Sequence, residues 1–205
     1  QASCVSNRCG GPRHNTTLGV LRTMNSDEAT VRGHLKSRFE STFEERVQRA
    51  LEVRPQIIIP HHHFTWASTE CVYLYRDGYF MATAMATQAL NEGLVRFIAD
   101  RNGISSNQDP YVLVDVFAAQ NIVSAACAEA MRRVLRSFRN DFHHLNPSIS
   151  NVPVQEIAKR NIEDIGVIEK EIFEHTYENG TLSPKQERYW DVRADGTMLV
   201  SLRFG

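Results

Sequence analysis

The sequence predicts an all-α protein, an up-and-down antiparallel bundle of four long helices followed by a C-terminal β-hairpin. Four long stretches carry apolar residues at helical spacing, and one stretch near the C-terminus has Asp-Gly between β-prone runs. With 205 residues, 42% of them hydrophobic and 23% charged, the chain has the composition of a globular protein with a sizeable core. We expect a flexible N-terminal arm over residues 1–25, the bundle over 26–180 and the hairpin appendage over 181–205.

The first two helices are predicted from their apolar spacing. Over residues 26–54, Ser26 can cap the start and Pro55 stops the helix, and the apolar stripe consists of Val31, Leu35, Phe39, Phe43, Val47 and Leu51. The second helix is predicted over residues 68–101, with Asn102-Gly103 as its stop signal. Its centre is apolar on more than one face, which is typical of a helix packed on several sides.

The third and fourth helices are predicted in the same way. The third begins after Asp109-Pro110, because proline suits a first helical turn, and extends to about Arg139. The fourth is expected from Pro153 to Asn179-Gly180, which closes it. The four predicted helices are therefore expected to pack into one helical core.

The last stretch has a different pattern. Ala194-Asp195-Gly196 lies between two β-prone runs, which predicts a hairpin over residues 189–202. An isolated two-stranded hairpin is marginally stable in water. We therefore expect this hairpin to dock on the bundle or on a second subunit.

Composition narrows the location and the partners. The net charge of −1 gives no overall positive field, so any nucleic-acid site has to be local. No stretch approaches the roughly 20 apolar residues of a membrane span. The four cysteines are too few for a disulfide framework, and Cys71 and Cys127 fall in apolar helical patterns, where a thiol behaves as a small hydrophobe. A reducing, cytoplasmic location is expected.

A cluster of cationic residues joins the third and fourth helices. Helical spacing places Arg132, Arg136 and Arg139 on one face, and His143 and His144 follow in the next turn. A guanidinium can hold two phosphate oxygens in a fork, and an imidazole can exchange a proton near neutral pH. Arginine with histidine is thus sufficient for metal-independent RNA cleavage. Alternatively, the arginines before Arg139 are solvated or pair with glutamates across the bundle.

The run Arg139-Asn140-Asp141-Phe142-His143-His144 resembles the signature of the HEPN domain family, an arginine, a polar residue and then a histidine a few positions later. Ala89-Leu90-Asn91-Glu92 in the second helix adds to the resemblance, which covers roughly residues 68–180. The resemblance implies a helical bundle with the motif between two long helices. It also implies a metal-independent endoribonuclease of a toxin–antitoxin or defence system, and a homodimer with both motifs in one cleft.

The resemblance assigns roles to the residues of the motif. Arg139 would bind the scissile phosphate and stabilise charge in the transition state. His144 would act as general base or general acid, and Asn140 would orient the arginine or a phosphate oxygen. His143 ranks second, as a substrate contact, and Asp141 would lie beside the histidines and raise their pKa.

Further expectations concern partners. Arg132 and Arg136 are expected to contact the substrate together with the motif. The expected partners are RNA, a second copy of the chain and an antitoxin protein; no cofactor, metal, DNA or membrane is expected. Two alternatives remain open: a non-catalytic module that binds a nucleotide or RNA in the same pocket, and a structural dimerisation protein.

Three smaller features keep more than one interpretation. His61 and His63 could bind a metal, line the RNA cleft or belong to an ordinary connector. The N-terminal arm contains three possible zinc ligands, Cys4, Cys9 and His14, whereas a structural zinc site needs four. Several aromatic residues could stack on bases or belong to the core: Trp66, Tyr73, Tyr75 and Tyr79.

Overall fold

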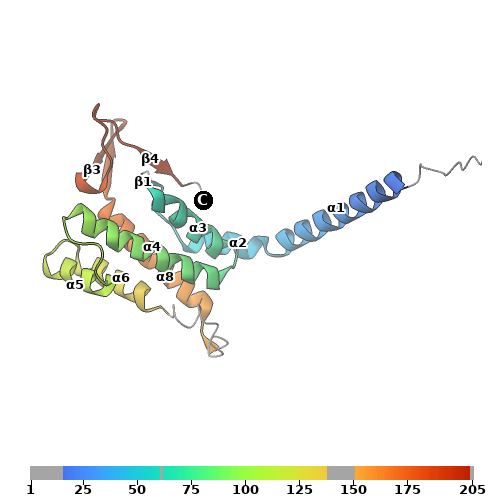
Figure 1. The fold of residues 1–205 in the computed structure, drawn as a ribbon, viewed down its shortest axis with the longest axis horizontal. Coiled ribbons are helices and arrows are strands. Elements are labelled where there is room, and N and C mark those ends of the chain that lie inside the picture. The colour runs from blue at the N-terminus through green and yellow to red at the C-terminus, as the bar shows by residue number, and fades with distance from the viewer. Residues whose placement is uncertain (1–15, 61, 138–150, 204–205) are drawn as a thin grey trace, which may run out of the picture. The chain divides into compact units, whose positions relative to one another are not determined.

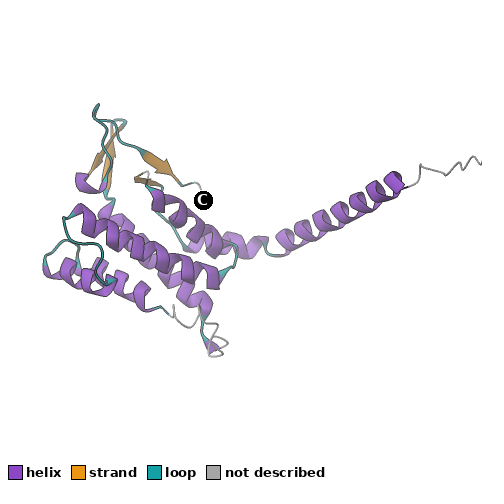
Figure 2. Cartoon of the chain, viewed as in Figure 1, coloured by secondary structure: helices purple, strands orange, loops and turns teal. Residues whose placement is uncertain are grey.

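The computed structural model describes residues 16–60, 62–137 and 151–203, with side chains from Asp27 onward. The described residues are mainly helical, with seven α-helices, one short 3-10 helix and four short strands (Figures 1 and 2). The chain divides into two compact units with their boundary between Glu45 and Arg46. Within the described ranges, no helix is long and apolar enough to cross a membrane.

The first predicted helix is two helices, α1 (Thr16–Ser41) and α2 (Phe43–Glu52). Because α1 begins at Thr16, the backbone of residues 16–25, which the sequence places in the N-terminal arm, is helical. The break follows two hydroxyl side chains, since Ser41 Oγ and Thr42 Oγ1 each donate to the Arg38 carbonyl at 3.0 Å. Such bonds compete with the helical ladder and bend helices.

The second predicted helix also divides, into α3 (His63–Arg76) and α4 (Phe80–Arg101). Gly78 lies between them with φ +83°, a left-handed conformation that glycine adopts readily and other residues rarely do. Helix α4 packs against α3, α5, α6 and α8, which confirms the expectation of a helix buried on several sides.

The third predicted helix divides into α5 (Pro110–Ala119) and α6 (Ala125–Arg136). Pro110 opens α5, as predicted, and Asn121 leaves the helical conformation with φ 53°. Ser124 then caps α6 by accepting a hydrogen bond from the Cys127 amide at 3.1 Å. Ser124 therefore starts a new helix within the stretch that the sequence predicts as one continuous helix.

The fourth helix, α8 (Val154–Ile172), ends before the predicted stop signal. The next residues form an antiparallel hairpin of β2 (His175–Glu178) and β3 (Thr181–Pro184). Asn179 and Gly180 connect the strands with φ values of 51° and 81°. Two successive positive φ angles are typical of a type I′ hairpin turn, so this Asn-Gly pair turns a hairpin and does not close a helix. The described residues are mainly helical, but they do not confirm a bundle of four long helices.

The predicted C-terminal turn is present, but the strand after it has another partner. Arg193 N donates to Thr197 O at 2.8 Å, and Gly196 has φ 82°. Beyond the turn, β4 (Val200–Leu202) pairs antiparallel with β1 (Ile58–Pro60), so the C-terminal stretch docks on the chain's own bundle. The short 3-10 helix η2 (Glu187–Tyr189) also anchors it, because Tyr189 is fully buried.

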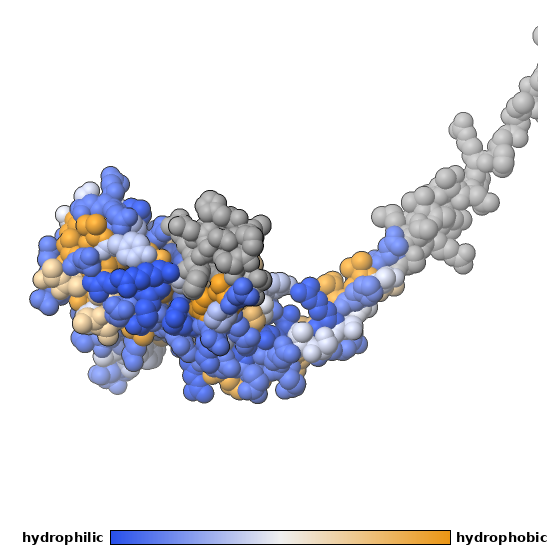
Figure 3. Space-filling view, turned by 90° about the horizontal axis from the view of Figure 1, so that it is seen from below, coloured by the Kyte–Doolittle hydropathy of each residue, from blue (hydrophilic) through white to orange (hydrophobic). Residues whose placement is uncertain are grey.

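The core lies where α4, α6 and α8 pack together. Its largest fully buried side chains include Leu94, Ile98, Leu113, Phe117, Met131 and Ile168. Cys71 and Cys127 are free thiols in this core, as predicted, and burial raises the pKa of Cys71 to about 12. On the face drawn in Figure 3, hydrophilic residues predominate and apolar residues form small separate patches.

Candidate functional site

The HEPN-like motif follows directly on α6. Its residues Arg139, Asn140, Asp141, His143 and His144 lie outside the described residues, which end at Ser137 on one side of the motif and resume at Asn151 on the other. The described part of the candidate site is therefore the last turn of α6 and the side chains of α4, α5 and α8 around it.

Ser137, the residue that caps the C-terminal end of α6, is held by side chains from two other helices. Its hydroxyl accepts from Gln88 Nε2 of α4 at 3.0 Å and from Asn161 Nδ2 of α8 at 2.9 Å. The same hydroxyl donates to the Val134 carbonyl at 2.7 Å, and Gln88 Nε2 also donates to the Ser137 carbonyl. All three side chains are at most 2% exposed. Three helices thus meet at one hydroxyl just before the motif begins.

Further buried polar side chains extend this network along α4. Asn161 Nδ2 donates to Thr87 Oγ1 at 3.1 Å, and Asn91 Nδ2 donates to the Met131 carbonyl at 3.0 Å. Burying polar groups is costly unless they are hydrogen-bonded, so these bonds restrict how α4, α6 and α8 can pack. We define Thr87, Gln88, Asn91, Ser137 and Asn161 as the buried amide network.

The network also contains acceptors that no described group uses. Gln88 Oε1, Asn91 Oδ1 and Asn161 Oδ1 are buried and have no hydrogen-bond partner among the described residues. A buried acceptor without a donor is unfavourable by about 1–3 kcal/mol. The interior next to the start of the motif is therefore polar and has a surplus of acceptors.

Two of the arginines on α6 are bound to carboxylates across the bundle. Arg132 donates to Asp115 of α5 at 2.7 and 3.2 Å, and Arg133 donates to Asp164 of α8 at 2.5 and 3.1 Å. The bond to Asp164 raises the pKa of Arg133. The carboxylate of Asp164 is almost fully buried, at 6% exposure, so Arg133 neutralises a buried charge. The alternative expectation was that these arginines pair with glutamates across the bundle; they do pair across it, but the partners there are aspartates.

Arg136, at the end of α6, differs from both. It is exposed and has no carboxylate partner among the described residues. Its charge acts on the phenol of Tyr111, whose pKa is raised by burial and lowered by Arg136, with burial the larger effect. Of the two arginines expected to contact substrate, Arg136 therefore has its guanidinium available for an anion, and Arg132 is already paired.

Of the three histidines at positions 61–63, His62 has a structural role. His61 lies outside the described residues, and His63 begins α3. The side chain of His62 is 7% exposed, with Nδ1 3.4 Å from Asp191 Oδ2 and the ring centre 4.9 Å from that of Phe97. Burial lowers the pKa of His62. The described residues contain no group of three side chains that could hold a metal, and the possible ligands of the N-terminal arm lie outside them.

The aromatic residues also divide between core and surface. Tyr75 is fully buried and donates to Glu52 Oε2 at 2.7 Å, so it belongs to the core. Trp66 is 79% exposed on α3. The guanidinium of Arg76 lies 4.6 Å from the ring centre of Tyr73. Of the four aromatic residues singled out for base stacking, Trp66 is the most available.

The buried amide network was missed in the sequence, although a signal was present. Gln88 and Asn91 interrupt a stretch that is otherwise apolar on several faces, and Asn161 lies between Ile157 and Ile165 of an apolar stripe. A polar residue at a core position predicts a buried hydrogen bond, but not its partner.

Comparisons of the chain with protein-family models, with curated proteins and with solved structures find no match.

Proposed function

We propose that the chain is a metal-independent endoribonuclease with a HEPN-type helical bundle, acting in the cytoplasm in a toxin–antitoxin or defence system. The observation that carries the proposal is the run Arg139-Asn140-Asp141-Phe142-His143-His144, which begins three residues after the last residue of α6 and precedes α8. The buried amide network supports it, because it fixes the end of α6 from which the motif starts. Precise placement of charged groups is what phosphoryl chemistry requires of a protein.

The reaction follows from the chemistry of the motif. The 2′-hydroxyl of the substrate attacks the adjacent phosphorus, the bond to the 5′-oxygen breaks, and a 2′,3′-cyclic phosphate remains. Arg139 stabilises the charge that develops on the phosphoryl oxygens, and Asn140 orients it. His144 takes the proton from the 2′-hydroxyl or gives one to the departing 5′-oxygen. His143 contacts the substrate, and Asp141 lies beside the histidines.

A homodimer completes the set of catalytic groups. One His144 cannot serve as base and acid at the same time, so we propose that a second copy supplies the other histidine. Arg136 extends the cationic surface for the RNA backbone, whereas Arg132 contributes less because Asp115 already binds it. An antitoxin partner would inhibit the enzyme by covering this cationic site.

The test is cleavage of a single-stranded RNA by the purified chain in EDTA. We expect the wild type to cleave RNA and to leave DNA of the same sequence intact, because DNA lacks the 2′-hydroxyl. Arg139→Ala and His144→Ala should each lose about 10²-fold or more, the usual scale for electrostatic and acid–base contributions.

Two matched variants sharpen the test. Arg136→Gln should weaken RNA binding and its salt dependence with a smaller loss of rate, and Arg132→Gln should weaken binding less than Arg136→Gln. Activity that needs zinc or manganese would contradict the mechanism. RNA that binds but stays intact would show a binding module in place of an enzyme.

A further inference from the structure

Helices α5 and α6 form a helical hairpin whose register is fixed by one contact. The two helices are joined by the short connector of residues 120–124 and pack against each other (Figure 1). Helices joined by so short a connection commonly run in opposite directions. Arg132 of α6 donates to Asp115 of α5 at 2.7 and 3.2 Å, so these two residues lie opposite each other.

One helical turn beyond that contact, Tyr111 of α5 lies beside Arg136 of α6. Residues four apart share a face of a helix and are about 6 Å apart along its axis. Tyr111 precedes Asp115 by four residues. Arg136 follows Arg132 by four, and in a hairpin both steps lead in the same direction. The electrostatics agree, because burial raises the pKa of the Tyr111 phenol and, among the neighbouring charges, Arg136 has the largest effect and lowers it.

Tyr111 is open to solvent while its backbone is held in place. The residue is 39% exposed, although it lies in the first turn of a helix that packs on two others. Its amide donates to Asp109 Oδ1 at 2.8 Å, the bond that caps the start of α5 and engages the Asp109 carboxylate. A ring on a capped helix is positioned more precisely than a ring on a loop.

Arg136 differs from Arg132 in its pairing, although only one turn separates them. Arg132 is bound by Asp115 and also lies 3.7 Å from Glu129. Arg136 is exposed and has no ion pair within the described ranges, and such a guanidinium can hold a phosphate. Arg139 of the motif follows Arg136 by three residues, so covalent geometry keeps their Cα atoms within about 11 Å of each other. Tyr111 and Arg136 are therefore close to the proposed cleavage site.

We infer that Tyr111 stacks on a base of the bound RNA while Arg136 binds a phosphate of the same strand, so that the pair holds a nucleotide near the one that is cleaved. Aromatic side chains bind unpaired bases by stacking, and arginine neutralises the backbone beside them. The inference rests on the proposed function, which makes the bound strand RNA. It adds a substrate contact that the motif does not contain, and it requires the nucleotide to be unpaired.

The test is binding of a fluorescein-labelled 2′-fluoro oligouridylate of about twelve nucleotides, followed by fluorescence anisotropy. This strand has no 2′-hydroxyl, so it stays intact whether or not the chain cleaves RNA. We expect Tyr111→Leu, which keeps an apolar side chain that a helix tolerates, to bind the strand about tenfold more weakly than the wild type. Tyr111→Phe keeps the ring and should bind within about twofold of the wild type.

Two controls separate stacking from other effects. Tyr177→Leu removes another exposed tyrosine, on β2, and should leave binding unchanged. A strand of the same length whose sugars carry no bases should bind equally well to the wild type and to Tyr111→Leu, because it has only the phosphates that Arg136 recognises. An equal loss for both strands in Tyr111→Leu would overturn the inference.

A cross-linking measurement on the wild type decides the inference even if Tyr111→Leu does not fold. A 5-iodouridine strand is irradiated in the complex, and mass spectrometry of the digested chain should find the cross-link at Tyr111. Cross-links only at other residues, or no binding of the oligouridylate at about 100 μM protein, would overturn the inference.

The outcomes also distinguish this inference from the proposed activity. If the chain binds the oligouridylate through Tyr111 but cleaves no RNA, the ribonuclease proposal fails and the stacking contact stands. If the chain cleaves RNA and Tyr111→Leu binds as tightly as the wild type, the activity stands and the stacking contact fails.

Discussion

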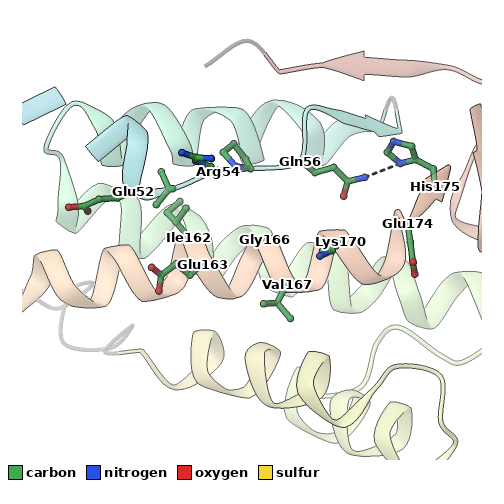
Figure 4. A pocket seen from close by; sticks show the side chains of 12 residues that line it. Glu52, Arg54, Gln56, Ile162, Glu163, Gly166, Val167, Lys170, Glu174 and His175 are labelled. Carbon is green, nitrogen blue, oxygen red and sulfur yellow. Dashed lines mark hydrogen bonds between the residues drawn. The ribbon is translucent and has the colours of Figure 1, made fainter. Parts of the chain in front are cut away.

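Two faces of α8 differ in how completely their polar groups are paired. The face toward the bundle carries three buried polar groups, each bonded to a residue far away in the sequence: Asn161 to Ser137, Asp164 to Arg133 and Glu169 to Arg203. The other face, which we call the groove face, borders a groove of about 620 Å³ between α8 and the connector from α2 to β1 (Figure 4). It carries Glu163, Gly166 and Lys170, for which the described structure shows no such bond. The first face therefore joins α8 to other parts of the fold through buried bonds, and the second has no such bonds within the described ranges.

The largest expected effect on stability concerns the ion pair of Glu169 and Arg203. The side chains are 1% and 4% exposed, Arg203 donates to both carboxylate oxygens at 2.8 and 2.7 Å, and Ser68 donates to one of them at 2.6 Å. Arg203→Met would leave a buried carboxylate without its cation, so we expect a loss of about 3–5 kcal/mol in the free energy of unfolding, measured with urea.

A double variant checks the cause of that loss. Glu169→Met together with Arg203→Met removes both charges, and we expect it to be more stable than Arg203→Met alone. If the double variant were less stable than Arg203→Met, the loss would not come from an unpaired charge, and the bundle face would not depend on its pairing.

The next effect compares the two faces directly. Asn161→Ala removes the bonds to Ser137 and Thr87 inside the bundle, and we expect it to reduce the free energy of unfolding by about 1–3 kcal/mol. Glu163→Ala, on the groove face of the same helix, should change it by no more than about 0.5 kcal/mol. Equal losses in the two variants would contradict the difference between the faces.

A pH-dependent contribution is expected where α8 ends. His62 packs on Phe64 and Phe97 and lies near Phe173, the residue that follows α8. Burial lowers the pKa of His62 below the ordinary value. A lowered pKa means that the folded state favours the neutral ring. Stability is therefore complete above the unfolded-state pKa of about 6.5 and is lost as the pH falls through the lower folded-state value.

The difference between the wild type and a His62→Phe variant isolates this contribution. As the pH falls from 8 to 5, the wild type should lose stability relative to the variant, because only the wild type has an imidazole at this position, and its protonation favours the unfolded state. A difference that grows in favour of the wild type as the pH falls would mean that the folded state prefers the charged ring, as expected if Asp191 were the dominant influence.

The smallest expected effect tests the space over Gly166. Gly166→Ala should raise the free energy of unfolding by about 0.5–1 kcal/mol, because the methyl group meets no neighbour and alanine favours the helix. Gly78→Ala is the opposite case, since φ +83° disfavours alanine and should lower stability. A loss of stability in Gly166→Ala would show that the glycine is required for packing.

The sequence located the helical stretches, because apolar spacing repeats over many residues and survives local breaks. It did not show where those stretches divide, since a break depends on one or two residues, such as Gly78 with its positive φ or Ser124 as a cap. Asn179-Gly180 carried a hairpin signal that the long apolar stripe before it obscured. Local signals at the end of a strong periodic pattern are therefore easily given the wrong meaning.

For the candidate site, the sequence predicts the motif but not the long-range bonds around it. The motif itself can be recognised because its residues are consecutive, and it stays a prediction because those residues lie outside the described ranges. The bonds that hold Ser137 join residues 49 and 24 positions apart, so no local pattern could pair them. The pairing of Arg132 with Asp115 likewise depends on the turn between α5 and α6, which the sequence did not reveal.

The proposed ribonuclease mechanism is tested most directly by a substrate with one altered nucleotide. After the cleavage site of an RNA has been mapped in EDTA, the 2′-hydroxyl next to the scissile phosphate is replaced by hydrogen in an otherwise identical strand. We expect cleavage at that bond to stop, and the unmodified strand to yield a 2′,3′-cyclic phosphate in the mass spectrum. Continued cleavage of the 2′-deoxy bond by the wild type would contradict attack by the substrate's own hydroxyl.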